Sequence, residues 1–98
     1  MHARVARFEG ADADAVRETI GEIRERAAEG PPEGVPAVGF LLLHDGENDN
    51  VLAISLFETA DDMRKGNEAL DAMDPPRPGG LGKRAAVEMY EVGIKVDP

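Results

Sequence analysis

The chain has 98 residues, of which 20 are acidic and 11 are basic, so its formal net charge is −9. This length is typical of one domain, and we expect residues 1–98 to fold as a single unit. The negative charge repels phosphate backbones and argues against a nucleic-acid partner. The lack of cysteine excludes a disulfide framework and cysteine metal ligands. Because the sequence has neither a signal-peptide pattern nor a run of about 18 apolar residues, we expect a cytoplasmic protein without a membrane span.

The first half of the chain predicts a strand, a helix and a second strand. His2–Phe8 is rich in strand-forming residues, and Gly10 ends it. Asp12 suits the N-cap of a helix, which Gly30 and two prolines end. One apolar stripe runs along this helix, made of Val16, Ile20, Ile23 and Ala27. Val35–His44 is then expected to be a strand.

The second half predicts a strand, a helix and a last strand. Asp45–Asn50 has the composition of a hairpin loop and leads into a strand at Val51–Phe57. Thr59 starts a second helix with a loose capping box, and Asp74-Pro75-Pro76 ends it. Pro76–Lys83 predicts a mobile connector or a lid over a pocket. Arg84–Val96 is the last strand, with Gly93 as a place for a bulge or bend.

The predicted order is β-α-β-β-α-β, which defines an α+β fold of the ferredoxin-like type. With right-handed crossovers, this order gives a four-stranded antiparallel sheet with two helices on one face. The helices leave the second face of the sheet without a cover from the same chain. The fold class therefore directs attention to what that second face carries.

The second face is predicted to be purely aliphatic. If the hairpin closes symmetrically, Phe40 faces Ser55 and His44 faces Val51, and cross-strand partners share a face. The opposite face then carries Leu41, Leu43, Leu52, Ile54 and Leu56. Exposing a large aliphatic side chain forgoes about 1.5–3 kcal/mol, and a contiguous patch marks an interface. We therefore expect a homodimer whose sheets pack face to face, the alternative being a monomer with an exposed sheet.

Three stretches carry a resemblance that covers essentially the whole chain: the opening strand HARVARF, the junction AISLFET and the closing strand VEMYEV. With the element order, they resemble the dimeric α+β barrel superfamily, and within it antibiotic-biosynthesis-monooxygenase-like proteins. The resemblance implies a homodimer with a ligand pocket between sheet and helices. It implies either a cofactor-independent monooxygenase acting on a phenolic or quinol-type substrate, or a non-catalytic ligand-binding or accessory module. The expected pocket residues are Phe40, Leu42, Ser55, Phe57, Met63, Asn67 and Tyr90.

Neither a haem cofactor nor a metal ion is expected. The haem-degrading branch of the superfamily has a Trp and a haem-ligating His at the positions matching Phe57 and Asn67. Asp45, Glu47 and Asp49 alternate as in a calcium loop, but the EF-hand pattern also needs a glycine and a glutamate. At those positions this chain has Asn50 and Leu56.

Asn67, Tyr90 and His44 are the weak candidates for catalysis. Asn67 lies on the helix stripe that faces the sheet, where its amide binds a ligand or nearby backbone. Tyr90 either binds a substrate oxygen or packs with its hydroxyl at the rim. His44 is either a general base or a solvated side chain at a strand end. Arg4 and Arg7 fall on opposite faces of the first strand. Either one of them binds an anionic substrate or forms a salt bridge across the dimer, or both are solvent-facing charges at strand ends.

Overall fold

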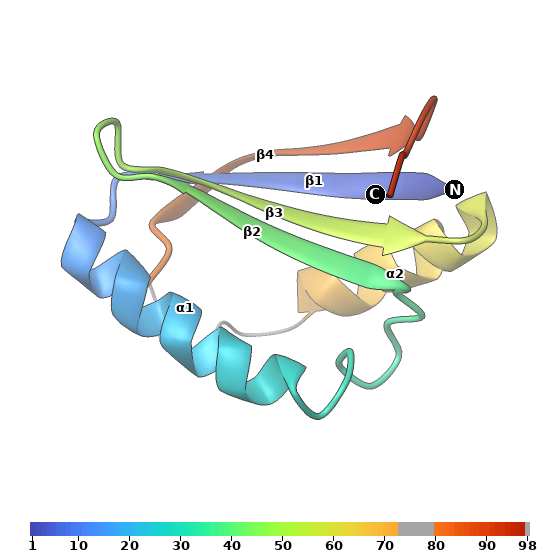
Figure 1. The fold of residues 1–98 in the computed structure, drawn as a ribbon, viewed down its shortest axis with the longest axis horizontal. Helices are drawn as coiled ribbons and strands as arrows, with labels where there is room; N and C mark the ends of the chain where they lie inside the picture. Colours follow the sequence, from blue (N-terminus) through green and yellow to red (C-terminus); the bar gives the residue numbers. More distant parts are fainter. Residues whose placement is uncertain (73–79, 98) are drawn as a thin grey trace.

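The computed structural model describes residues 1–72 and 80–97, and it arranges them as one sheet and one layer of helices (Figure 1). The elements are β1 (His2–Glu9), α1 (Ala13–Ala27), β2 (Gly39–Asp45), β3 (Asn50–Phe57), α2 (Ala60–Ala72) and β4 (Lys83–Glu91). This order confirms the prediction. The expected helix end at Asp74–Pro76 and most of the expected connector Pro76–Lys83 lie outside the described residues.

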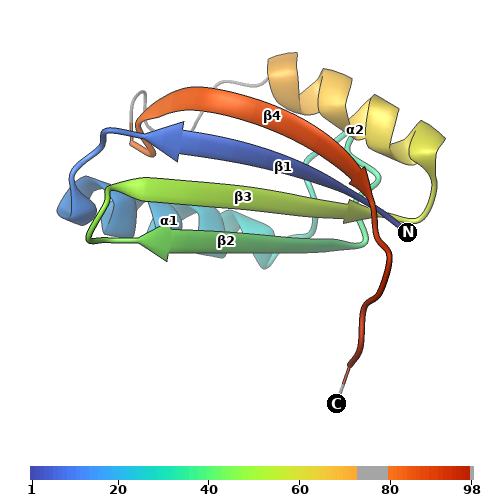
Figure 2. The same ribbon diagram turned by 90° about the horizontal axis from the view of Figure 1, so that it is seen from above.

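The sheet has the strand order β2-β3-β1-β4, and every neighbouring pair is antiparallel. Both helices cover the same face, and the view from above looks onto the opposite face (Figures 1 and 2). The hairpin register is the expected one, with Phe40 opposite Ser55 and His44 opposite Val51. The two-sided apolar character of β3 therefore follows from its position in the interior of the sheet.

Both helices begin at the expected caps. The side chain of Asp12 accepts hydrogen bonds from the backbone N–H groups of Asp14 and Ala15, each at 3.0 Å. The hydroxyl of Thr59 accepts one from the N–H of Asp62 at 3.0 Å. These side chains satisfy backbone donors that have no partner within the first helical turn.

The core consists of two clusters, one under each helix. The cluster under α1 contains Ala11, Val16, Val51 and Leu81, with Phe8, Ile20, Ile23 and Leu42 packed around it. The cluster under α2 contains Val35, Phe57 and Met63. Of the apolar stripe predicted for α1, Val16, Ile20 and Ile23 face the sheet, whereas Ala27 at its end is exposed.

Two strands are shorter than predicted because each has only one neighbour. β4 pairs with β1 alone, and β1 begins at His2, so the pairing stops at Glu91 and not at Val96. A last hydrogen bond joins the N–H of Val92 to the carbonyl of Met1 at 2.9 Å. Similarly, β2 pairs only with β3 and begins at Gly39, not at Val35.

The irregularity in β4 lies at a different place from the one predicted. Gly93 is outside the strand, and the register shift falls where Arg7 pairs with Ala86 and Phe8 pairs with Arg84. Ala85 is the extra residue of this bulge. Neither described helix is long and apolar enough to cross a membrane.

Candidate functional site

The two faces of the sheet differ as the sequence predicts. On the helix-covered face of β3, Ser55 and Phe57 are buried. On the other face, Leu41 and Leu43 are about half exposed, at 49% and 47%. Within the described part of the chain nothing packs over this second surface, which we call the open face (Figure 2). A ligand pocket between sheet and helices must therefore lie on the side of Ser55 and Phe57.

The space around Phe57 is filled by protein. Phe57 has no exposed surface and contacts Val35 and Met63. Its ring lies directly against the backbone of Gly66 in α2, where an added Cβ atom would be 2.5 Å from Cζ and closer still to Cε1. Real side-chain carbons do not approach so closely, because the favourable separation is about 3.5–4.0 Å. Phe57 and Met63, both expected in the pocket, are thus parts of a closed core.

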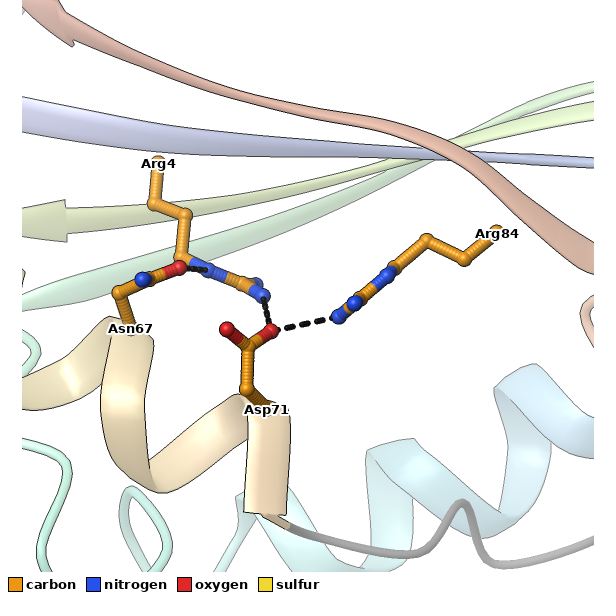
Figure 3. Close-up of polar contacts among 4 residues, drawn as sticks. All are labelled: Arg4, Asn67, Asp71 and Arg84. Carbon is orange, nitrogen blue, oxygen red and sulfur yellow. Dashed lines mark hydrogen bonds and ion pairs between the residues drawn. The ribbon is translucent and has the colours of Figure 1, made fainter.

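Asn67 belongs to a cluster of polar side chains that joins α2 to the sheet (Figure 3). The Nε of Arg4 donates to Oδ1 of Asn67 at 2.8 Å, and Nη2 of Arg4 donates to Oδ1 of Asp71 at 3.2 Å. Nη1 of Arg84 donates to the same Asp71 oxygen at 2.6 Å. The cluster therefore ties the last two turns of α2 to β1 and β4.

The charges in this cluster affect one another. Arg4 is only 5% exposed, and burial lowers the pKa of its guanidinium, while the charge of Asp71 acts in the opposite direction. The hydrogen bond from Arg84, together with both arginine charges, lowers the pKa of the Asp71 carboxyl. Since a buried cation needs a partner, the carboxylate and the Asn67 amide stabilise Arg4 in place. The polar contacts of this cluster therefore serve to hold α2 against the sheet.

This arrangement does not fit a haem in the position that the haem-degrading branch uses. The amide oxygen of Asn67 is occupied by Arg4, and the Phe57 ring fills the space beside Gly66. An amide is in any case a poor ligand for iron, which proteins bind through imidazole, thiolate or phenolate groups.

The structure separates Tyr90 from Asn67, contrary to the expected pocket. Tyr90 is the cross-strand partner of Ala3, so it lies on the open face, whereas Arg4 and Asn67 meet on the helix-covered face. Its hydroxyl donates to Oε2 of Glu88 at 2.6 Å, and this hydrogen bond raises the pKa of the phenol. The bulge at Ala85 hid this register from the sequence pattern.

His44 lies at the hairpin end of β2, and its side chain is partly exposed. Its Nε2 is buried and has no hydrogen-bond partner among the described residues, and the ring lies near Gly46. The neighbouring Asp45 closes the hairpin, since its carboxylate accepts bonds from Glu47 and Asn48. The bond from the Asn48 side chain is the main cause of the lowered pKa of Asp45. Among the described residues, no acidic side chain hydrogen-bonds Nε2 of His44.

The open space on the helix-covered side lies elsewhere, in a groove of about 780 Å³. It runs between the C-terminal end of α1, the connection from residue 28 to residue 38, β2, and Leu70 of α2. We call it the α1–β2 groove. It is lined by Ile23, Arg26, Ala27, Glu29, Gly30, Pro31, Pro32, Glu33, Val35, Ala37, Val38, Gly39, Phe40, Ser55 and Leu70.

Of the seven expected pocket residues, the groove contains Phe40 and Ser55. Leu42 packs instead against the core cluster under α1. The groove combines apolar walls with the hydroxyl of the buried Ser55 and the half-exposed ring of Phe40. Its charged lining residues, Arg26, Glu29 and Glu33, are exposed.

Sequence reasoning missed the contribution of the connection between α1 and β2. Pattern reading marks the first part of this connection only as a helix end, and it assigns residues 35–38 to the following strand. The sequence did contain one signal, the apolar residues Val35 and Ala37 on either side of Pro36. Proline has no backbone N–H and cannot donate a hydrogen bond to a neighbouring strand. That combination is typical of a loop that packs its side chains against the core.

Comparisons with known proteins identify the fold. No known family profile matches the chain, and no curated protein matches its sequence. Among solved structures, an arginine-to-serine mutant of MhuD with two manganese protoporphyrin IX molecules bound per active site is similar over 100% of both chains, with a TM-score of 0.68 and 19% identity. A Deinococcus radiodurans protein assigned to the antibiotic biosynthesis monooxygenases has a TM-score of 0.56 and 14% identity, covering 100% of this chain and 98% of its own.

These likenesses confirm the fold expected from the resemblance. The chain has the ferredoxin-like α+β architecture that it shares with both solved structures.

Proposed function

We propose that this chain is a small-molecule-binding dimeric α+β barrel protein whose ligand lies in the α1–β2 groove. The groove itself is the observation that carries the proposal. Its volume of about 780 Å³ falls within the range of about 300–1,000 Å³ that is typical of small-molecule sites. Its apolar walls with a single buried hydroxyl are also typical of such sites.

The lining favours an aromatic ligand with one hydrogen-bonding oxygen, such as a phenol or quinol. Phe40 offers a ring for stacking, and Ser55 offers a hydroxyl that donates or accepts. The solved neighbours support a small-molecule role, since one binds a metalloporphyrin and the other is assigned to the monooxygenases.

Ligand binding is tested by calorimetric titration with a panel of phenols and quinols. Phe40→Ala removes stacking and apolar contact worth about 1.5–3 kcal/mol, so the Kd should rise roughly 10–100-fold. Met89→Ala is the matched control, because Met89 is 47% exposed and Phe40 is 48% exposed, and they lie on strands at opposite edges of the sheet. Equal affinity of the two variants for every ligand contradicts the groove as the site.

Oxygenation is the second candidate function, favoured by the monooxygenase neighbour. A phenol with a free para position reacts with O₂ to give a quinone and water, with one oxygen atom entering the ring and all electrons coming from the substrate. The described groove lining contains no His or Tyr, and its two carboxylates, Glu29 and Glu33, are exposed, so it offers no buried base to deprotonate the phenol, which favours binding without catalysis. Oxygen uptake equal to quinone formation, lost in Phe40→Ala, would establish oxygenation over simple binding.

The open face supports the homodimer. Leu41 and Leu43 are half exposed, and Leu52, Ile54 and Leu56 are half-buried, so a face-to-face partner would bury a continuous aliphatic surface. Sedimentation at micromolar concentration should give twice the chain mass of 10.5 kDa. Leu52→Glu should shift the protein to the monomer, whereas Met89→Glu on the helix-covered face should not. A wild-type protein that sediments as a monomer contradicts the homodimer.

The cytoplasmic location expected from the sequence stays a prediction.

A further inference from the structure

The mouth of the α1–β2 groove carries more negative than positive charge. Its exposed charged side chains are Arg26 in the last turn of α1 and Glu29 and Glu33 on the connection that follows. Within residues 1–72 and 80–97, no ion pair involves either glutamate. Arg26 offsets at most one of the two carboxylates, so the mouth retains a negative charge.

The C-terminal end of α1 adds to this negative character. α1 ends at Ala27, and both Ala27 and Gly30 line the groove. The aligned peptide dipoles of a helix leave a partial negative charge of about 0.5 at its C-terminal end, which favours a nearby cation. The net charge of −9 on the whole chain acts in the same direction and attracts cationic molecules.

The turn that carries Glu33 is held in place. The N–H of Val35 donates to the carbonyl of Pro32 at 3.1 Å, and Val35 is buried in the core cluster under α2. Pro31 and Pro32 restrict the backbone that leads into this turn. The exposed carboxylate of Glu33 is therefore attached to a fixed part of the groove wall.

The sheet side of the groove offers a hydroxyl and an aromatic ring. Ser55 lines the groove and is 4% exposed, and the hydrogen bonds between described residues include none to its hydroxyl. Its cross-strand partner Phe40 is half exposed, and the face of an aromatic ring attracts a cation. A ligand that reaches from the sheet to the connection therefore meets a hydroxyl and a ring on one side and negative charge on the other.

We propose that the ligand of the α1–β2 groove is an aromatic amine that also carries a hydroxyl group. Its hydroxyl binds Ser55, its ring packs on Phe40, and its ammonium group lies at the mouth beside Glu33 and the C-terminal end of α1. This inference rests on the proposed binding function and adds the charge of the ligand. A ligand with a carboxylate in place of the ammonium group would face the negative charge of the mouth and bind weakly.

Calorimetric titration with three phenols that differ in charge tests the inference. Tyramine has an ammonium group, 4-ethylphenol is neutral and 4-hydroxyphenylacetate has a carboxylate. At neutral pH and low salt, tyramine should bind roughly 3–30-fold more tightly than 4-ethylphenol, through its ion pair at the mouth and its attraction to the ring. 4-Hydroxyphenylacetate should bind most weakly, and added salt should reduce the differences among the three phenols.

Variants at the mouth locate the effect. Glu33→Gln should lower the affinity for tyramine about threefold and leave the affinity for 4-ethylphenol unchanged, whereas Arg26→Gln should raise the affinity for tyramine. Glu25→Gln is the matched control, because Glu25 is an exposed glutamate of α1 outside the groove lining, and it should change neither affinity. A general loss of folding cannot produce effects of opposite sign at Glu33 and Arg26.

The outcomes separate this inference from the proposed function. If a neutral phenol or 4-hydroxyphenylacetate binds at least as tightly as tyramine, the charge assignment is overturned and the groove remains a site for small molecules. Equal effects of Glu33→Gln and Glu25→Gln on the affinity for tyramine overturn it as well. If neither tyramine nor any phenol or quinol of the panel binds, both the inference and the proposed function are overturned.

Discussion

The contact between Phe57 and Gly66 predicts that replacing a glycine by alanine destabilises the protein when the glycine is in α2 and stabilises it when the glycine is in α1. Gly66→Ala places a methyl group 2.5 Å from Cζ of Phe57, about 1 Å inside the favourable carbon–carbon distance. Because Phe57 is fully buried, its ring has no free space to move into. Overpacking of this kind costs about 1–3 kcal/mol, whereas replacing a helical glycine returns up to about 1 kcal/mol. We expect a net loss of about 1–2 kcal/mol.

Gly21→Ala is the matched control, because Gly21 lies inside α1 and an added methyl there would meet nothing within 4 Å. It should stabilise the protein by up to about 1 kcal/mol. Urea unfolding followed by circular dichroism, at one fixed protein concentration, measures both variants. Adding Phe57→Leu to Gly66→Ala should cost less than the sum of the two single changes. A Gly66→Ala protein at least as stable as the wild type refutes the packing described here.

Three further predictions concern hydrogen bonds. Asp71→Asn removes a carboxylate whose pKa is lowered in the folded protein by Arg84 and Arg4, so its stabilising effect is complete above the unfolded value of about 3.9 and is lost as the pH falls through the lowered folded value. Because Asp71 is 43% exposed and water screens its ion pairs, the variant should be less stable by about 1 kcal/mol at pH 7 and should differ little from the wild type at the lowest pH where both stay folded. Denaturant titrations across pH measure this, and a pH-independent difference contradicts it. Asp12→Ala should lower stability by about 1 kcal/mol in urea unfolding, whereas an unchanged midpoint excludes Asp12 as an effective cap. Tyr90 is the only tyrosine, so ultraviolet absorbance reports its ionisation directly. Glu88→Gln should bring the raised pKa of Tyr90 back toward about 10, and an unchanged pKa would exclude the hydrogen bond as the cause.

The parts of the fold that sequence determines locally could be predicted. The symmetrical loop Asp45–Asn50 sets the register of β2 and β3, and alternation along these strands then assigns every residue to a face. Alternation separates Ser55 and Phe57 from Leu52 and Ile54, and the family resemblance then implies that Ser55 and Phe57 face the helices, as the structure shows. The caps at the starts of both helices are equally local.

The rest depends on contacts between distant residues. Arg4 is 63 positions from Asn67 and 67 from Asp71, so no spacing rule indicates that these side chains meet. The register of β4 is set by pairing with β1 and by a bulge, which put Tyr90 on the face opposite to the expected one. The α1–β2 groove is formed largely by an irregular connection, which has no period to read.

The position of β1 at the centre of the sheet has a consequence for how the protein is made. Of the four strands in this sheet, β1 leaves the ribosome first, yet its neighbours are β3 and β4, and β4 ends only at Glu91. At about 5–20 residues per second, the ribosome needs roughly 4–16 s to synthesise the chain between β1 and the end of β4. Until then β1 has an unpaired edge, and chains that stop before β4 retain it. Truncated translation products should therefore aggregate or be degraded, and chaperones that bind extended apolar segments should engage the nascent chain during this interval.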